Sequence, residues 1–322
     1  MRQDGSLQPV DLNNPTGTTG LIAIDKRGSH ALFFDPSSLE PLARLPLPAR
    51  PHEVAIAADH RHAYVSIYGN GVYGNNTEPG RAIVVIDLAA REVVATLDVS
   101  PFRAPHGLQL GPDHLLYASC DQSGVIAVVD PATERLVGSI DAGSTGPHMI
   151  ALVPNGSKLY SENEEDPFVS VMDPSSRRLL RTVPTPGGSA GISTDGDAVL
   201  VVHAQEPLLT RIEVASDTVS GQIPLAGHTK PAQRVRHSPD GRYVVVTSME
   251  EPLLTILDAA DPSRQTSLQV ADGPMGVAFA PDNRTLLVGN HGAGRVTVID
   301  LQAGCIQREF AAGVGVETLA FY

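Results

Sequence analysis

A short apolar segment that ends in an acidic residue recurs seven times along the chain. The acidic residues are separated by 40 to 52 positions and are Asp35, Asp87, Asp130, Asp173, Glu213, Asp258 and Asp300. Each copy is followed by a second apolar stretch, such as REVVATLDV, and most are preceded by two alternating segments around an Asp or Asn turn, as in PHEVAIAADHRHAYVS. Alternation with period two around tight turns predicts antiparallel hairpins, so each repeat is expected to hold four strands.

Four antiparallel strands in about 43 residues are typical of one blade of a β-propeller. The first repeat, at about residues 21–47, lacks the innermost strand, and the segment GVETLAFY at the end of the chain matches it. We therefore predict an all-β, seven-bladed β-propeller that forms a single domain over residues 1–322. Blade 1 would combine about residues 20–48 with residues 315–322, which closes the ring and removes an open sheet edge.

Composition restricts the partners of such a protein. A formal net charge of −13 argues against nucleic acid and against an anionic membrane surface, because both require a cationic footprint. The first ten residues, MRQDGSLQPV, contain no apolar stretch typical of a signal peptide, and no apolar run has the length of a membrane span. We expect a soluble, cytoplasmic monomer whose partner is a small-molecule substrate.

The pattern PHEVAIAAD, AYVS and VVIDLAAREVVATL resembles the YVTN-type propeller repeats, which are relatives of the lactonase-like and surface-layer propellers. The resemblance covers nearly the whole chain, whereas the WD and kelch signatures of other propellers are absent. It implies the propeller fold and, among several activities, the opening of a lactone. The family also includes redox-enzyme subunits and exported binding proteins, so the fold by itself does not select one activity.

The innermost strands carry a set of equivalent polar positions. Counting seven residues back from each turn Asp or Asn gives His52, His106 and His148 in blades 2 to 4, and alignment of the last strand places Glu317 in blade 1. Equivalent positions in a radial repeat lie at one height around the axis, so these four would form a contiguous arc. Three imidazoles and a carboxylate suit a divalent metal ion such as Zn, Fe or Mn, which can polarise a carbonyl or activate water.

A structural role is the alternative for these histidines. Each shares its strand phase with apolar residues, and the Pro-His pair recurs at this position of the repeat. They could pack between blades and bond backbone groups. Glu317 favours the hypothesis of a metal site, because recurrence of the Pro-His pair does not account for a carboxylate at the equivalent position.

Other candidates are expected on the same face, which carries the connections between second and third strands and between blades. We assign proton transfer to Glu162, His203 and Tyr68, and substrate contacts to Gln233, Tyr73, His291 and Arg234. The strand phase sends Arg234 away from Gln233. Tyr68 and Tyr73 belong to a long glycine-rich loop that could act as a lid. Glu162 and Glu164 are expected near the rim.

These observations favour a metal-dependent enzyme that hydrolyses, eliminates from or isomerises a small carbonyl compound at the mouth of the channel. The alternative is a non-catalytic propeller that binds a protein or a small ligand on the same face. A third hypothesis, an accessory of a redox enzyme, would require a partner subunit. Cys120, beside Asp121, is a further candidate nucleophile.

Overall fold

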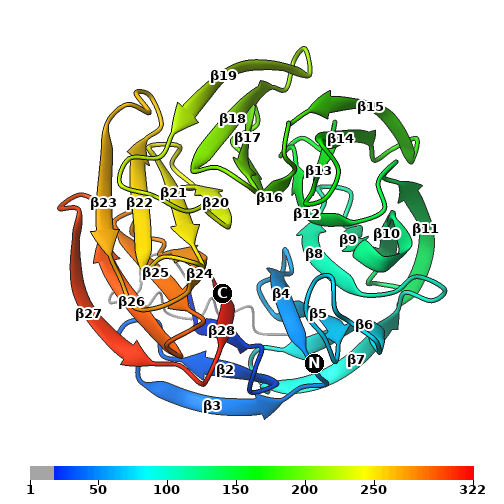
Figure 1. Ribbon diagram of the computed structural model, residues 1–322. Coiled ribbons are helices and arrows are strands. Elements are labelled where there is room, and N and C mark those ends of the chain that lie inside the picture. Colours follow the sequence, from blue (N-terminus) through cyan, green and yellow to red (C-terminus); the bar gives the residue numbers. More distant parts are fainter. Residues whose placement is uncertain (1–17) are drawn as a thin grey trace, which may run out of the picture.

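The computed structural model describes residues 18–322, which form seven four-stranded antiparallel sheets arranged as blades around a central axis (Figure 1). The predicted seven-bladed β-propeller is therefore confirmed. In every blade the strands follow one another in chain order from the axis outward, except that the last strand of the chain is the innermost strand of blade 1. The short 3-10 helix η1 (Asp121–Ser123) interrupts blade 3.

From the axis outward, blade 1 holds β28 (Val316–Phe321), β1 (Leu21–Asp25), β2 (His30–Phe34) and β3 (Pro41–Pro46). In the same order, blade 2 holds β4 (Pro51–Ile56), β5 (His62–Gly69), β6 (Pro79–Asp87) and β7 (Glu92–Asp98). Blade 3 holds β8 (Pro105–Leu110), β9 (Leu116–Cys120), β10 (Val125–Asp130) and β11 (Arg135–Asp141). Blade 4 holds β12 (Pro147–Leu152), β13 (Leu159–Asn163), β14 (Phe168–Asp173) and β15 (Arg178–Pro184). Blade 5 holds β16 (Ser189–Thr194), β17 (Ala198–His203), β18 (Leu208–Glu213) and β19 (Thr218–Pro224). Blade 6 holds β20 (Arg234–His237), β21 (Tyr243–Ser248), β22 (Leu253–Asp258) and β23 (Gln265–Gln269). Blade 7 holds β24 (Pro274–Phe279), β25 (Thr285–Asn290), β26 (Arg295–Asp300) and β27 (Cys305–Ala311).

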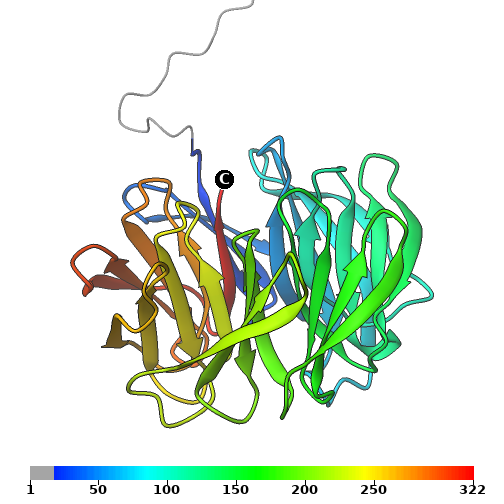
Figure 2. The same ribbon diagram turned by 90° about the horizontal axis from the view of Figure 1, so that it is seen from above.

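The two ends of the described chain meet in blade 1. Strand β28 pairs antiparallel with β1, from Leu21 opposite Phe321 to Asp25 opposite Val316. Beyond the strands, the Tyr322 N–H donates to the Gly20 carbonyl at 3.0 Å. Figure 2 shows the C-terminal end of β28 at the upper face of the disc, which carries the turns between first and second strands. The backbone pairing thus joins the ring across the point where the chain would otherwise leave an edge.

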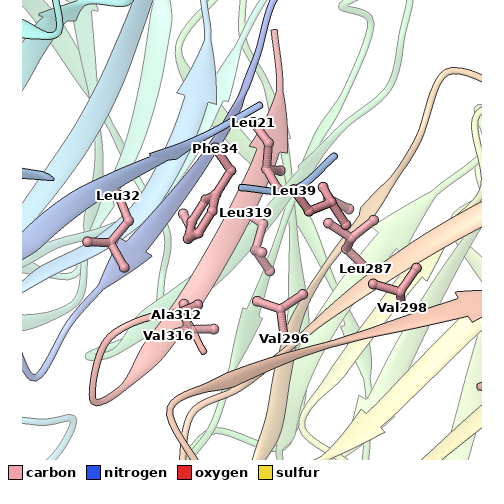
Figure 3. Packing of buried hydrophobic residues seen from close by; sticks show 12 residues of the cluster. Leu21, Leu32, Phe34, Leu39, Leu287, Val296, Val298, Ala312, Val316 and Leu319 are labelled. Atoms are coloured by element: carbon pink, nitrogen blue, oxygen red, sulfur yellow. The ribbon is translucent and has the colours of Figure 1, made fainter. Parts of the chain in front are cut away.

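The hydrophobic core lies between neighbouring blades. One cluster joins Leu21 and Leu319 of blade 1 to Leu287 and Val298 of blade 7 (Figure 3). The inner strands are apolar on both faces because both faces are covered, whereas the outermost strand alternates, as in β3, where half-buried and exposed positions follow each other. Stacking of the blades thus stabilises the ring and fixes the inner strands around the channel.

The innermost strands are not regular. In β4, Pro51 lies opposite Ile67 and Val54 opposite Val65, so His52 and Glu53 together face Ser66 alone. The same shift occurs in β8 at His106 and in β12 at His148. This is a β-bulge, which adds one residue to one strand and re-aims the side chains there. The predicted arc of histidines therefore sits on a row of bulges.

Among residues 18–322, no helix has the length and hydrophobicity that a membrane crossing requires. Both cysteines of the chain are free: Cys120 is buried and Cys305 is exposed.

Candidate functional site

A cavity of about 300 Å³, called the site cavity below, opens where the bulges meet the loops of the lower face. All eight residues predicted as metal ligands or substrate contacts line it: His52, His106, His148, Glu317, Gln233, Tyr73, His291 and Arg234. They come from blades 1 to 4, 6 and 7. The face expected to carry a site therefore does hold a cavity at the channel.

The three histidines form a column of rings along one wall of the site cavity. The ring centroids of His52 and His106 are 4.5 Å apart, and those of His106 and His148 are 4.0 Å apart. Tyr73 closes one end, with its ring 4.9 Å from that of His148. Tyr68 packs behind the column, 4.6 Å from the ring of His52. The bulges thus place equivalent imidazoles in contact with one another.

A ladder of hydroxyl groups holds the bulges in place. The Ser66 hydroxyl accepts the Glu53 N–H at 3.1 Å and donates to the His106 carbonyl in the next blade at 2.8 Å. Ser119 repeats this between Gly107 and the His148 carbonyl. Each hydroxyl therefore satisfies two buried backbone groups that the bulge leaves unpaired.

Blade 4 breaks this ladder with a carboxyl group. Glu162 lies opposite His148 and Met149, where Ser66 and Ser119 lie in blades 2 and 3. Its Oε1 accepts the Met149 N–H at 2.9 Å and lies 2.8 Å from His148 Nδ1. Since Oε1 already accepts one N–H, the arrangement favours Nδ1–H of His148 as a second donor. His148 Nε2 then has no hydrogen-bond partner among residues 18–322 and is the ring nitrogen left to serve the site cavity.

Burial sets the protonation of these groups. Desolvation raises the pKa of Glu162 to about 8, with a smaller opposing effect of the Met149 N–H. Desolvation also lowers the pKa of His148, and that of His52 and His106 well below the ordinary value, with further lowering of His106 by its imidazole neighbours. The three imidazoles are therefore neutral near pH 7, and neutral imidazole is the form that accepts a proton.

The site cavity also carries ion pairs around Glu317. Its Oε1 lies 3.3 Å from Lys26 Nζ and 3.5 Å from Arg234 Nη2, and its Oε2 lies 3.0 Å from His291 Nδ1. Burial would raise the pKa of Glu317, but Lys26 and its other cationic neighbours hold it well below the usual range. Glu317 is therefore an ionised partner of cations in this structure.

Arg234 is buried and lines the site cavity. Its Nη2 lies 2.8 Å from Glu53 Oε1, both side chains are buried, and its Nη1 has no hydrogen-bond partner among the described residues. Arg234 was expected to point away from Gln233, and both residues line the site cavity.

Lys26 and Glu53 were not predicted from the sequence. Lys26 follows the second strand of blade 1, the same connection that carries His291 in blade 7, so its place in the repeat was a usable signal. Glu53 follows His52 directly in the bulge of β4, where both residues lie opposite Ser66.

Three predicted residues do not line the site cavity. Tyr68 is buried and its hydroxyl donates to Asp121 Oδ2 at 2.6 Å, so it is no part of a mobile lid. His203 bonds Thr210 through Nε2 at 2.6 Å, as Asn163 bonds Ser170 in blade 4, which is a structural contact of the repeat. Glu162 is wholly buried in β13 rather than at the rim.

Two further expectations change. Glu164, which follows β13, lines the site cavity with its Oε1 3.5 Å from His148 Nδ1. Cys120 is buried, and desolvation raises the pKa of its thiol to about 12, which opposes the thiolate that a nucleophile requires.

The predicted metal ligands do not converge in this structure. Within residues 18–322, no group of three or more His, Cys, Asp or Glu side chains is arranged to hold a metal ion. Glu317 is engaged by Lys26 and His291, and His148 Nδ1 by Glu162. Binding of Zn, Fe or Mn by the arc stays a prediction without support from this geometry.

Comparison with known proteins supports the fold alone. Hydrazine synthase of Kuenenia stuttgartiensis superposes with a TM-score of 0.68 at 18% identity, over 84% of this chain and 89% of that one. A functionally unknown protein of Desulfotomaculum acetoxidans DSM 771 superposes with a TM-score of 0.77 at 14% identity, over 94% and 99%. No protein-family model and no curated protein matches the chain. The resemblance to YVTN-type and lactonase-like propellers is therefore not confirmed beyond the propeller fold.

Proposed function

We propose that the protein is an enzyme that binds a small anionic carbonyl compound in the site cavity and transfers a proton on it through His148. The observation that carries this proposal is the buried pair of His148 and Glu162, where blades 2 and 3 hold serines. A carboxyl group that orients an imidazole from behind is the arrangement expected of a general base and the group that positions it. Glu162 is then a positioning residue and not a substrate contact.

The charge of the site cavity supports an anionic substrate. Its lining has four cationic side chains, Lys26, Arg27, Arg50 and Arg234, and two acidic ones, Glu164 and Glu317. This local excess of positive charge occurs in a chain whose formal net charge is −13. The unpartnered Nη1 of Arg234 is a donor suited to a carboxylate oxygen. A cavity of about 300 Å³ lies at the lower end of the range for ligand sites and favours a small substrate.

The chemistry follows from the free nitrogen of His148. In lactone hydrolysis, Nε2 would take a proton from the attacking water and return it to the ring oxygen that leaves. In elimination, it would take the proton from the carbon beside the carbonyl while a group on the next carbon leaves with its bonding electrons. In isomerisation, it would take the same proton and return it to a different atom of the substrate. In all three reactions a neutral imidazole removes a proton close to the carbonyl group of the substrate. Arg234 and Lys26 bind the anionic group of the same substrate.

Calorimetric titration with small oxocarboxylates, and with lactones that carry a free carboxylate, tests the binding half of this proposal. We expect saturable binding that Lys26→Met weakens about tenfold or more, while Arg264→Met, at an exposed arginine far from the channel, changes nothing. Equal affinity in wild type and Lys26→Met would reject the site. Binding without turnover would favour the non-catalytic alternative.

The metal is a separate hypothesis with its own test. Elemental analysis of protein purified without an affinity tag should give about one equivalent of a transition metal, lost in His106→Ala, if the arc binds one. Absence of metal from both proteins would reject it.

A further inference from the structure

The site cavity holds a second pair of a histidine and a carboxylate. The Nδ1 of His291 lies 3.0 Å from Glu317 Oε2, whereas the Nδ1 of His148 lies 2.8 Å from its own carboxyl partner. Resting on the proposed function, we propose that His291 is a second proton-transfer residue opposite His148. The reaction then inverts the configuration of a carbon atom beside the carbonyl group of a small carboxylate.

The two histidines lie on opposite sides of the channel. His148 belongs to β12 of blade 4, and His291 directly follows β25 of blade 7. Two blades separate them in one direction around the ring and three in the other (Figure 1). Both line the same cavity of about 300 Å³, so a small substrate held there lies between them. Imidazoles on either side of a substrate serve opposite faces of one carbon atom.

The repeated Pro-His pair does not account for His291. The three stacked histidines share one position of the innermost strands, whereas His291 directly follows the second strand of its blade. None of the other six residues at this position of the described chain is a histidine: Lys26, Asn70, Asp121, Glu164, Ala204 and Met249 in blades 1 to 6. An imidazole at this place is therefore specific to blade 7 and to the site cavity.

Glu317 is suited to position His291. Its Oε1 lies 3.3 Å from Lys26 Nζ and 3.5 Å from Arg234 Nη2, so the carboxylate is held from the other side. His291 Nδ1 is at ion-pair distance without an aligned hydrogen bond, and catalytic contacts of this kind tighten when substrate binds. The Nε2 of His291 has no hydrogen-bond partner among residues 18–322 and is the nitrogen left for the substrate. Glu317 is then a positioning residue and His291 a catalytic one.

The two imidazoles close the proton balance of the reaction. His148 Nε2 takes the proton from the carbon, and the electrons of the C–H bond move into an enolate whose oxygen carries the charge. His291 Nε2–H donates a proton to the opposite face of the same carbon, and the enolate electrons form the new C–H bond. His148 is left as an imidazolium and His291 as a neutral imidazole. Proton exchange with water, or the reverse reaction, restores the starting forms.

Deuterium incorporation into α-keto-β-methylvalerate tests the inference on the unaltered protein. The chiral carbon of this oxocarboxylate lies beside its ketone carbonyl. In deuterium oxide we expect each enantiomer to be converted to the other. The new enantiomer should carry deuterium while the remaining starting enantiomer still carries hydrogen, because one residue takes the proton and another gives the deuteron. Proton NMR measures the exchange, and near-ultraviolet circular dichroism measures the inversion.

Variants separate the two histidines. Interconversion should fall about 10²–10⁴-fold in His148→Gln and in His291→Gln. Each variant should still exchange the hydrogen of one enantiomer only, and a different enantiomer in each. His62→Gln, at a partly exposed histidine that begins β5 on the upper face, should behave as wild type. Far-ultraviolet circular dichroism shows whether each variant folds.

Three results overturn the inference and leave proton removal by His148 standing. The first is exchange and inversion at the wild-type rate in folded His291→Gln. The second is equal loss of exchange for both enantiomers in His291→Gln, which would assign His291 to binding. The third is exchange by the wild type without inversion. Absence of exchange by the wild type also overturns the inference, and the proposed function falls with it only if no other anionic carbonyl compound is converted.

Discussion

Glu162 Oε1 lies 2.8 Å from His148 Nδ1 in a pair that is almost completely shielded from water. The corresponding residues of blades 2 and 3 are Ser66 and Ser119, whose hydroxyls bridge neighbouring blades. A carboxyl group at this position is therefore a departure from the structural pattern of the repeat. Its second oxygen, Oε2, has no hydrogen-bond partner among residues 18–322, so the exchange of serine for glutamate costs stability that a purely structural role does not explain.

The stability of the protein should report the burial of Glu162. Its pKa is about 8 in the fold and about 4.5 in the unfolded chain, so the folded state holds the proton more tightly. The stabilising contribution is complete below pH 4.5 and is lost as the pH rises towards 8. Glu162→Gln should remove this loss and be more stable than wild type at pH 8 by about 4 kcal/mol. Urea unfolding at pH 5 and pH 8 measures it, with Glu92→Gln as an exposed control. If the free energy of unfolding changes equally between pH 5 and pH 8 in wild type and Glu162→Gln, the Glu162 carboxyl is not the cause of the change.

His52 and His106 should make the fold sensitive to acid. Burial lowers both pKa values well below 6.5, so the unfolded chain binds protons that the folded chain refuses. Stability should fall as the pH drops below 6.5, by about 1 kcal/mol for each histidine between pH 6.5 and 5.5. In His106→Gln, the fall in the free energy of unfolding between pH 6.5 and 5.5 that the two histidines cause should be about half as large. Urea unfolding at the two pH values measures it. An unchanged slope in His106→Gln would mean that His106 is protonated in the fold.

Arg234 should be more important for stability than any surface charge. Its removal leaves Glu53 and Glu317 as buried carboxylates without their shared cation. Arg234→Met should therefore destabilise the protein by about 3–5 kcal/mol. The double variant Arg234→Met, Glu53→Gln should recover part of this loss, since it removes one of the stranded charges. Thermal unfolding of both variants measures the effect, and a double variant less stable than the single one would contradict it.

The repeat made the fold predictable, because seven copies of one pattern and a stray innermost strand at the chain end allow only a closed ring. It also predicted the face and most of the residues of the site cavity. The position of Glu53 was not predictable from alternation, since the bulge in β4 shifts the phase of that inner strand. One signal for the bulge was present. A Cβ on Gly276 would lie 2.3 Å from the Glu317 carbonyl oxygen, so glycine at the second bulge position marks a close approach between blades.

Burial was the second property that the sequence left open. Glu162 and Tyr68 stand in polar surroundings in the sequence, yet both are covered once the blades stack. Their partners, His148 and Asp121, come from other strands or blades and are brought close only by the ring. The pairing of Glu162 with His148 therefore required the structure.

The reaction rate should follow the ionisation of Glu162. An ionised carboxyl holds Nδ1–H of His148 and stabilises the imidazolium that forms when Nε2 takes a proton. We expect kcat to rise as the pH increases through about 8 and this step to be absent in Glu162→Gln. Stopped assays between pH 6 and 9.5 measure it, with KM determined at each pH. A pH profile that Glu162→Gln leaves intact would assign the ionisation to another group.

Turnover of a panel of small anionic lactones and oxocarboxylates, followed by proton NMR in wild type, His148→Gln and His203→Gln, tests the central claim most directly. His203 is a buried histidine outside the site cavity and provides the matched control. We predict conversion of at least one compound, a loss of about 10²–10⁴-fold in His148→Gln, and a rate close to wild type in His203→Gln. Equal rates in wild type and folded His148→Gln, or no conversion of any compound by the wild type, would contradict the account.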